Sequence, residues 1–303
     1  MANKDSRPID SELSAAPDAG GIDFSIVIPC LNGETTLRRQ LSALVSQSFH
    51  GRYEVLVADN GSTDSTVSII EDFERRYPWV RRVDAGGRKG INHARNRGID
   101  ESGGNFILFC DSDDEVDRDW LQEMASSVSN GSVAVGGTLD RRLPGGERLS
   151  IERRLYTMFW DIPWPAGANC GFSRSVFEAV GKFDEELMGG ADETDYFWRI
   201  HFAGYSTDLV EGAIVKYFVR AQLKQVFRQA FNYGASHVRL YAKYRTLGMP
   251  RSNPLRSLAV IGHSCVVLLS ARKRSPERRK AVERLGAHLG RIRGSIQERV
   301  IYL

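Results

Sequence analysis

The chain has 303 residues, of which 42% are hydrophobic and 26% charged, the ordinary balance of a soluble globular protein with one large or two smaller domains. The net charge of +3 hides an asymmetry, because residues 216–303 hold 19 Lys and Arg against 3 Glu, whereas residues 1–215 are acidic. No apolar run reaches the roughly 20 residues of a membrane-spanning helix. Residues 1–22 are too polar for a signal peptide, so we expect a disordered tail there.

The first half of the chain alternates short apolar segments with helical stripes of apolar residues. We expect strands at 24–28, 53–58, 80–83 and 106–110, and helices at 35–47, 67–77, 91–99 and 120–128. Pro29 is expected to end the first strand. This alternation predicts crossover connections and a mostly parallel sheet with helices on both faces.

The second half of the chain is less regular. We expect strands at 133–137 and 212–220, a loop at 143–150, a short strand and a helix within 166–181, and helices at 192–204 and 222–247. The helix at 192–204 begins with acidic residues, which suit a helix N-terminus. Four cysteines, Cys30, Cys110, Cys170 and Cys265, lie far apart without C-x-x-C spacing, so we expect thiols in a reducing, cytoplasmic compartment.

Residues 106–114 read FILFCDSDD, so a predicted buried strand runs directly into Asp111, Asp113 and Asp114. Asp and Ser commonly form turns after a strand, and that interpretation stays open. Three carboxylates so close together repel one another, however. A divalent cation such as Mg²⁺ or Mn²⁺ is the usual compensation, and it commonly bridges a phosphate-bearing substrate.

The polar and Gly-rich segments each follow a predicted strand. In an open parallel sheet, ligands bind beyond the carboxyl ends of the strands. We therefore expect four segments, PCLNGE, ADNGSTD, GGRKG and CDSDD, to converge on one rim of the sheet and form a site.

Six segments in order from Phe24 to Arg220 together resemble the family 2 glycosyltransferases: SIVIPCLNGETTL, EVLVADNGSTDST, GINHARNRGI, FILFCDSDDEV, GANCGFSRSVFEAVGKFDEEL and DETDYFWRI. The resemblance implies the GT-A fold, a Rossmann-like and mostly parallel α/β sheet flanked by helices. It also implies inverting transfer of one sugar from a nucleoside-diphosphate sugar, expected to be a UDP-sugar, to an acceptor hydroxyl. The catalytic domain would cover 23–220, with a nucleotide-binding half at 23–115 and an acceptor half at 116–220, followed by a basic helical region at 221–303.

The resemblance assigns the nucleoside to residues that follow the first two strands: Pro29, Leu31, Asn32, Glu34, Asp59 and Asn60. A carboxylate at Asp59 can accept the imide N–H of uracil, although Asp59 also fits a turn-capping role. Asn60 stands where many relatives carry a second Asp. Lys89 and Arg95 would bring positive charge to the base and diphosphate, with a plain surface position as the alternative for Arg95.

The segment DSD at 111–113 matches the family's D-x-D motif. The resemblance implies that Asp111 contacts the ribose or the metal's water shell, with Ser112 beside the nucleotide sugar. Asp113 would ligate the Mn²⁺ or Mg²⁺ that bridges the two phosphates, with Asp114 as a supporting partner. The cation would neutralise charge on the leaving nucleoside diphosphate.

The resemblance also implies a general base for the acceptor hydroxyl. Aligning the family's E-D-x-D pattern on Arg199 places Asp192 at the Glu position and Glu193 at the position of the catalytic Asp. This departs from the family, because Glu is one methylene longer than Asp. Either residue therefore remains a candidate base, and capping of the helix N-terminus remains the alternative role for both.

Three other functions are weighed against this resemblance. A phosphatase of the haloacid dehalogenase type also places D-x-D after a strand, but it expects Thr or Val where Glu115 stands. A catalytically inactive nucleotide-sugar binding protein is supported only by Glu193. A processive synthase would carry Q-x-x-R-W and membrane spans, whereas Gln229 replaces the Trp and no span is present.

The basic C-terminal region predicts an anionic partner. The apolar run at 257–269 is too short to span a bilayer, yet long enough for a helix that lies in its surface. We therefore expect reversible attachment to the inner face of the membrane, toward a lipid-linked acceptor, with glycans and small molecules also open as acceptors. A core helix packed on the catalytic domain is the equal alternative for 257–269. No nucleic-acid binding motif appears, and none is expected.

Overall fold

The computed structural model describes residues 21, 23–187, 189–272 and 275–303, so the expected tail at 1–22 lies outside the described residues except for Gly21. The strands are β1 Phe24–Cys30, β2 Tyr53–Asp59, β3 Val80–Asp84, β4 Phe106–Cys110, β5 Glu115–Val116, β6 Ala134–Arg142, β7 Arg148–Glu152, β8 Asn169–Ser173 and β9 Asp208–Phe218. The helices are α1 Leu37–Leu44, α2 Thr66–Arg76, α3 Ile91–Asp100, α4 Trp120–Ser129, α5 Arg174–Val180, α6 Asp192–Phe202, α7 Leu223–Tyr244, α8 Pro254–Ser270 and α9 Pro276–Gln297.

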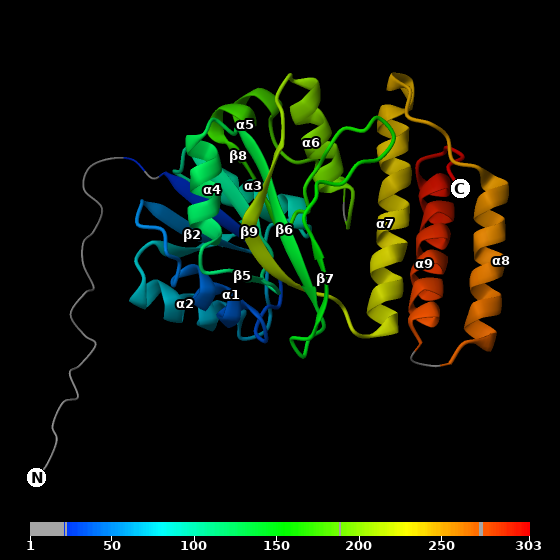
Figure 1. Cartoon of the computed structure of the whole chain (residues 1–303), viewed down its shortest axis with the longest axis horizontal. Helices are drawn as coiled ribbons and strands as arrows, with labels where there is room; N and C mark the ends of the chain where they lie inside the picture. The colour runs from blue at the N-terminus through cyan, green and yellow to red at the C-terminus, as the bar shows by residue number, and fades with distance from the viewer. Residues whose placement is uncertain (1–20, 22, 188, 273–274) are drawn as a thin grey trace, which may run out of the picture.

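The strands form one sheet with the order β3-β2-β1-β4-β8-β6-β9-β5, and β7 extends it by pairing with β6 (Figure 1). Strands β3, β2, β1 and β4 are parallel, as the alternation of strands and helices predicts. Strand β8 is antiparallel to both β4 and β6, whereas β9 is parallel to β6. The parallel half therefore supplies a rim where several strands end together.

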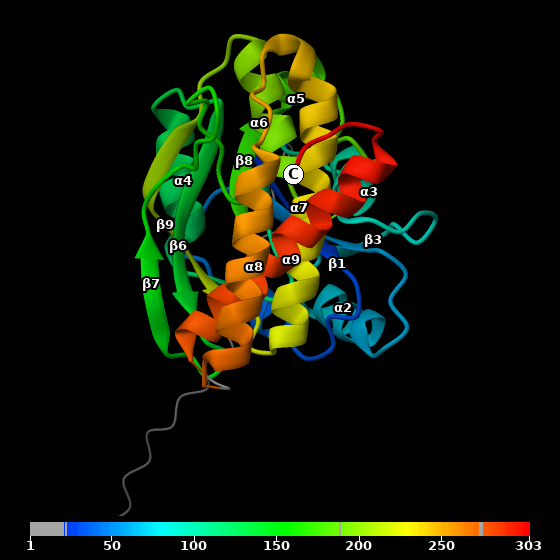
Figure 2. The same cartoon turned by 90° about the vertical axis from the view of Figure 1, so that its right-hand side faces the viewer.

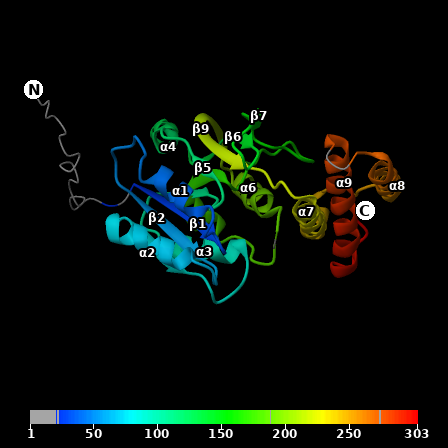
Figure 3. The same cartoon turned by 90° about the horizontal axis from the view of Figure 1, so that it is seen from below.

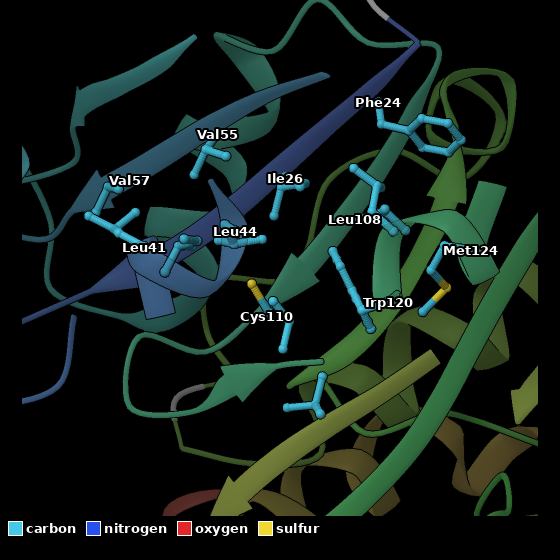
Figure 4. Packing of buried hydrophobic residues seen from close by; sticks show 14 of the residues in the cluster. Phe24, Ile26, Leu41, Leu44, Val55, Val57, Leu108, Cys110, Trp120 and Met124 are labelled. Atoms are coloured by element: carbon cyan, nitrogen blue, oxygen red, sulfur yellow. The ribbon is translucent and has the colours of Figure 1, made fainter. Parts of the chain in front are cut away.

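Two hydrophobic cores cover the two faces of the sheet, because neighbouring residues of a strand point to opposite faces. Ile26 and Ile28 of β1 pack with α1, α2 and α4, whereas Val27 between them packs with α3 and α6. Figure 4 shows the first core, where Leu41 and Leu44 of α1 lie against the sheet. Helices on both faces fix the strands, so the loops at the rim are held by buried structure on both sides.

Several expected boundaries are wrong. The strand expected at 133–137 is β6 Ala134–Arg142, and the strand expected at 212–220 is β9 Asp208–Phe218. Strand β1 continues through Pro29 to Cys30. Its pairing with β4 ends at Val27 and only β2 borders it beyond that point, so a residue without an N–H is tolerated. The expected loop at 143–150 contains the start of β7. Leu149 and Ile151 of β7 do alternate with polar residues, but the run is only five residues long and is exposed along most of its length.

Helices α7, α8 and α9 lie together on one side of the sheet domain (Figure 2), and the predicted boundary at 220 falls in the link between β9 and α7. Helix α7 is joined to α6 by a third core that includes Trp198, Val238 and Tyr244. Lys243 of α7 also forms an ion pair of 2.7 Å with the buried carboxylate of Asp195. Among the described residues, no helix combines the length and apolar character that crossing a membrane requires.

Helices α7 and α9 approach very closely because glycines stand at their contact. A Cβ at Gly290 of α9 would collide with the backbone carbonyl of Phe231, and one at Gly234 of α7 would collide with that of Ala287. Gly286 and Gly294 continue the same stripe on α9. Helix α9 is therefore fixed to α7, and α8 packs in turn on α9.

Candidate active site

Two hollows open at the rim where β1, β2 and β4 end. The first has a volume of about 510 Å³, and its lining includes Pro29, Leu31, Asn32, Asn60, Lys89, Asp111, Ser112, Asp113 and Arg220. The second has a volume of about 540 Å³, and its lining includes Arg95, Asp111, Asp113, Asp192, Glu193, Tyr217, Arg220, Gln225, Arg228, Gln229, Asn232 and Tyr233. The convergence expected from the sequence thus holds, and Asp111, Asp113 and Arg220 belong to both hollows.

The carboxylates of Asp111, Asp113 and Asp114 meet at this junction, each with an oxygen within 4.8 Å of the others. Asp113 is exposed, whereas Asp114 is fully buried. Oδ1 of Asp114 accepts a hydrogen bond of 3.0 Å from the Phe218 N–H, but its Oδ2 has no partner among the described residues. Burial and the neighbouring carboxylates raise the pKa of Asp111 to about 7 and raise that of Asp114 well above its ordinary value. The charges of Arg95 and Arg220 oppose the rise in the pKa of Asp111 but do not offset it.

Helix α1 holds the acidic turn in place. The buried amide of Gln40 donates to the Asp111 carbonyl at 3.1 Å and accepts from the Val116 N–H at 2.9 Å. Arg39 donates to the Asp113 carbonyl at 2.5 Å and lies over the Phe218 ring. The sequence analysis missed Gln40, although a polar residue within the apolar stripe of a helix is a detectable signal.

Asp59 and Asn60 at the end of β2 contact the loops around them. Asp59 is fully buried and accepts from the Arg82 guanidinium at 2.7 Å and from the Ser62 N–H at 3.0 Å. Burial alone would raise the pKa of Asp59. The hydrogen bonds from Ser62 and Arg82 and the charge of Arg82 outweigh that effect and lower the pKa. Asn60 accepts from the Gly90 N–H at 2.8 Å and donates to the carbonyls of the Gly-rich loop. Asp59 thus makes the turn-capping contact, does not line either hollow, and its nucleoside role stays a prediction.

Asn32 and Glu34 join the loops after β1 and β2. Asn32 has a left-handed backbone with φ of 55°, and its side chain accepts from the Thr63 N–H at 2.9 Å. Glu34 accepts from the Ser65 N–H at 3.2 Å and is absent from the lining of the first hollow. Pro29 and the exposed Leu31 do line that hollow, so the loop offers an apolar surface there.

Arg95 links the rim to the start of α6. Its buried guanidinium forms ion pairs with the carboxylates of Asp192 and Glu193, the latter at 3.0 Å. The alternative of a surface position for Arg95 is therefore wrong. Gly167 leaves space for the ion pair of Arg95 with Glu193, because a Cβ at residue 167 would collide with both side chains. Arg95 lines the second hollow, and its predicted contact with the base and diphosphate stays a prediction.

The two candidate bases differ in exposure. Residues 189–191 all have positive φ, and this left-handed stretch delivers the first turn of α6 to the second hollow. The side chain of Glu193 is 23% exposed, whereas that of Asp192 is 3% exposed. Burial and the Glu193 charge raise the pKa of Asp192 to about 7, although Arg95 opposes the rise. Glu193 is thus the more accessible carboxylate.

Arg220 is the main residue that the sequence analysis did not assign. It follows β9, and among the described residues its guanidinium makes no hydrogen bond or ion pair, although its charge opposes the rise in the pKa of Asp111. Gln225, Arg228, Gln229 and Asn232 of α7 form the polar wall of the second hollow. No local motif marks these residues, because only the fold of α7 against the sheet domain brings them to the rim.

Comparison with known proteins agrees with this geometry. The profile of Glycosyl transferase family 2 matches residues 25–181, more than half of the chain. Glycosyltransferase AglE of Haloferax volcanii is 28% identical over 228 residues, which cover 72% of this chain and 73% of AglE. Poly(ribitol-phosphate) beta-N-acetylglucosaminyltransferase TarS of Staphylococcus aureus is 30% identical over 106 residues, 35% of this chain and 18% of TarS.

The fold has a counterpart among solved structures. The crystal structure of S. aureus TarS 1–349 in complex with UDP-GlcNAc aligns with a TM-score of 0.55 at 16% identity, covering 93% of each chain. This similarity confirms the expected GT-A fold. The matched relatives are named as glycosyltransferases, so the phosphatase alternative has no support. The chain belongs to glycosyl transferase family 2 and is a glycosyltransferase.

Proposed function

We propose that the protein transfers one sugar from a UDP-sugar to an acceptor hydroxyl, with inversion at the anomeric carbon and with a divalent cation as cofactor. The observation that carries this proposal is the junction of the two hollows at Asp111, Asp113 and Arg220. A donor in the first hollow would place its diphosphate beside these residues. Its sugar would then point toward the second hollow, where Glu193 lies.

The first hollow suits a nucleoside diphosphate. Pro29 and Leu31 offer an apolar edge, and Lys89 offers a positive charge. The backbone of Gly90 lies between the two hollows without a side chain to obstruct a phosphate. The UDP-GlcNAc complex of TarS supports UDP as the nucleotide, since that protein shares the fold.

The acidic cluster fits a divalent cation. Asp113 is exposed at the junction, and Asp114 directs a carboxylate oxygen with no partner among the described residues into buried surroundings. Mg²⁺ and Mn²⁺ favour such oxygen ligands. We assign Asp113 as a ligand, with Asp111 and Asp114 beside it. When bound, the cation would stabilise negative charge on the leaving diphosphate, and the guanidinium of Arg220 would add to that effect.

Glu193 is the proposed general base. It borders the second hollow, is more exposed than Asp192, and is oriented by its 3.0 Å ion pair with Arg95. A base on the acceptor side of the sugar, opposite the leaving diphosphate, gives a single displacement and inversion. Asp192 is the alternative base, and its burial argues for a positioning role.

The C-terminal region supports a proposal about where the enzyme works. Residues 212–276 contain twelve Lys and Arg and no Asp or Glu. We propose peripheral attachment to an anionic membrane surface, on its inner face, with an acceptor that is carried there. Positive charge near an anionic leaflet favours such attachment. The polar wall of α7, with Gln225, Gln229 and Asn232, suits a hydroxyl-rich acceptor.

A donor panel tests the proposed reaction. Nucleotide sugars that include UDP-GlcNAc are incubated with the protein and Mn²⁺, and release of nucleoside diphosphate is measured. We expect UDP-sugars to turn over slowly by hydrolysis, and EDTA or Asp113→Ala to abolish turnover while the thermal unfolding midpoint is kept. Asp100→Ala is the matched control, because Asp100 ends α3 far from both hollows and forms an exposed ion pair with Lys182. Full turnover in EDTA, or in the Asp113→Ala protein, would exclude the metal role.

A further inference from the structure

The outermost helix, α8, carries large apolar residues on its exposed face, and half-buried Val260, Ile261, Val267 and Leu268 lie toward α9. The buried residues of α8 are Ser257 and Ser264, which face α9. Leu255, Leu258, Val266 and Leu269 face outward and are 76%, 60%, 62% and 90% exposed. These positions recur at helical spacing, so they form one apolar stripe along the whole helix. A helix on the surface of a globular protein normally turns such a stripe inward.

The inner face of α8 is held by specific polar contacts. The Ser257 hydroxyl and the His288 ring of α9 are 2.9 Å apart. Arg278 of α9 donates to the Leu268 carbonyl at 2.7 Å and thereby caps the end of α8. These contacts, together with the half-buried Val260, Ile261, Val267 and Leu268, fix the orientation of α8 and leave the apolar stripe outside the core. The alternative expected from the sequence was a core helix at 257–269 packed on the catalytic domain. It is wrong, because α8 packs on α9.

The stripe faces away from the sheet domain. Figures 1 and 3 show α8 beyond α9 on the side opposite the sheet. An exposed apolar surface of this extent marks an interaction site. Because both hollows lie on the other side of α7, a partner on the stripe would leave them open.

Charge around the stripe selects the kind of partner. Arg251 and Arg256 at the start of α8 and Arg272 after its end are exposed, and α8 itself has no acidic residue. The nearest acids after α8 are Glu277 and Glu283 of α9. They lie among four basic residues, Arg278, Arg279, Lys280 and Arg284. A second copy of this chain would oppose like charges across the stripe, whereas an anionic surface would complement them.

We propose that the outer face of α8 docks onto an anionic phospholipid surface and lies in the plane of its headgroups. Leu255, Leu258, Val266 and Leu269 would enter the apolar boundary, and Arg256 and Arg272 would contact phosphate groups. The inference specifies the face used for the membrane attachment proposed above, and it rests on that proposal for its biological purpose. The helix lies on the surface, since none of the described helices meets the requirements of a span.

Vesicle flotation with the full chain tests this docking. The probes are vesicles of phosphatidylcholine alone and of phosphatidylcholine mixed with phosphatidylglycerol, each at low and high salt. We expect binding to the anionic vesicles at low salt and a loss of binding at high salt. The double variant Leu258→Ser and Leu269→Ser should reduce partitioning about tenfold or more, because two large apolar side chains no longer enter the boundary.

The matched control changes two exposed apolar residues elsewhere, Leu149→Ser and Ile151→Ser on β7, and should bind as the wild type does. Nucleotide-sugar turnover without vesicles is measured for each variant, so a failure of the proposed reaction remains separate from a failure of docking. The proposal is overturned if the wild type does not float with anionic vesicles, or if both double variants bind equally. It is also overturned if the α8 variant instead abolishes self-association seen by sedimentation velocity.

Discussion

Arg95 is the residue on which the arrangement at the start of α6 depends. Its guanidinium is the shared partner of Asp192 and Glu193 in a buried site. Removing one member of a buried charged group leaves the others uncompensated, which costs about 3–5 kcal/mol. We therefore expect Arg95→Met to lower the free energy of unfolding by about that amount in urea titrations.

Arg97→Met is the control for this change, because Arg97 lies on the same helix and forms an exposed ion pair with Glu101. Such a surface pair contributes at most about 1 kcal/mol. Equal unfolding midpoints for the two variants would show that Arg95 does not hold the two acids together.

The two acids beside Arg95 should behave differently in catalysis. We expect Glu193→Gln to reduce transfer about 10²–10⁴-fold, the usual contribution of a general base, while binding of the UDP-sugar measured by calorimetry persists. Asp192→Asn should act more weakly, because its carboxylate is buried behind Glu193. Glu147→Gln serves as the control, since Glu147 is exposed in the turn between β6 and β7. If Glu193→Gln transfers sugar at the wild-type rate, the base lies elsewhere.

Sequence patterns could reveal the residues that a motif marks. Asp111 and Asp113 follow an apolar strand, so their place at the rim was predictable, and the structure brings their carboxylates together. The contacts of Gln40 and Arg220 depend on how distant elements pack. Gln40 reaches the acidic turn across 71 residues of sequence, and Arg220 reaches it only because β9 ends beside β5. Local sequence patterns therefore could not predict either contact.

At the scale of elements, the strands and helices with a regular apolar pattern were predictable. Strand β4 has the expected bounds, because its five residues are all buried between two layers of helices. Strand β7 and the short β5 were not expected. Their pairing depends on β6 and β9 rather than on their own composition. No sequence pattern indicates that β8 inserts antiparallel beside β4.

The contact between α7 and α9 is an element whose stability one residue can test. A Cβ at Gly290 would collide with the Phe231 backbone, which cannot move aside as a flexible side chain would. We expect Gly290→Ala to lower the free energy of unfolding by about 1–3 kcal/mol through this overpacking.

Gly262→Ala, also in a C-terminal helix, is expected to raise the free energy of unfolding. A Cβ at Gly262 of α8 would have no atom within 4 Å. Replacing an exposed helical Gly by Ala stabilises a helix by up to about 1 kcal/mol. Thermal unfolding midpoints of the two variants are compared. If Gly290→Ala is as stable as Gly262→Ala, the close contact between α7 and α9 does not contribute to stability.

At the scale of the whole molecule, the three C-terminal helices are held to the sheet domain across a basic interface. A cavity there has a volume of about 220 Å³ and is lined by Arg141, Arg220, His237, Arg279, Glu283 and Arg291, among others. Burial and the Arg291 charge lower the pKa of His237 to about 4. This interface therefore favours the neutral imidazole.

The pH dependence of stability follows from that shift. Because the pKa of His237 is lower in the folded chain than its ordinary value of 6.5, its contribution is fully present above pH 6.5. Below that pH the unfolded chain binds a proton that the folded chain does not. Stability should then decline toward pH 4 by up to about 1.4 kcal/mol per pH unit. We expect His237→Gln to flatten the fall in thermal midpoint between pH 7 and pH 5.

His263→Gln is the control for this prediction. The wild type and both variants share the titrating carboxylates, so a difference between the pH profiles comes from His237. His263 is exposed on α8, so its replacement should leave the pH profile of the wild type unchanged. The unfolding midpoint is measured by scanning calorimetry at each pH for wild type and both variants. If the His237→Gln profile is as steep as the other two, protonation of His237 does not weaken the attachment of the C-terminal helices. The acid sensitivity of the molecule would then arise from other titrating groups, among them His288 of α9, whose pKa burial also lowers.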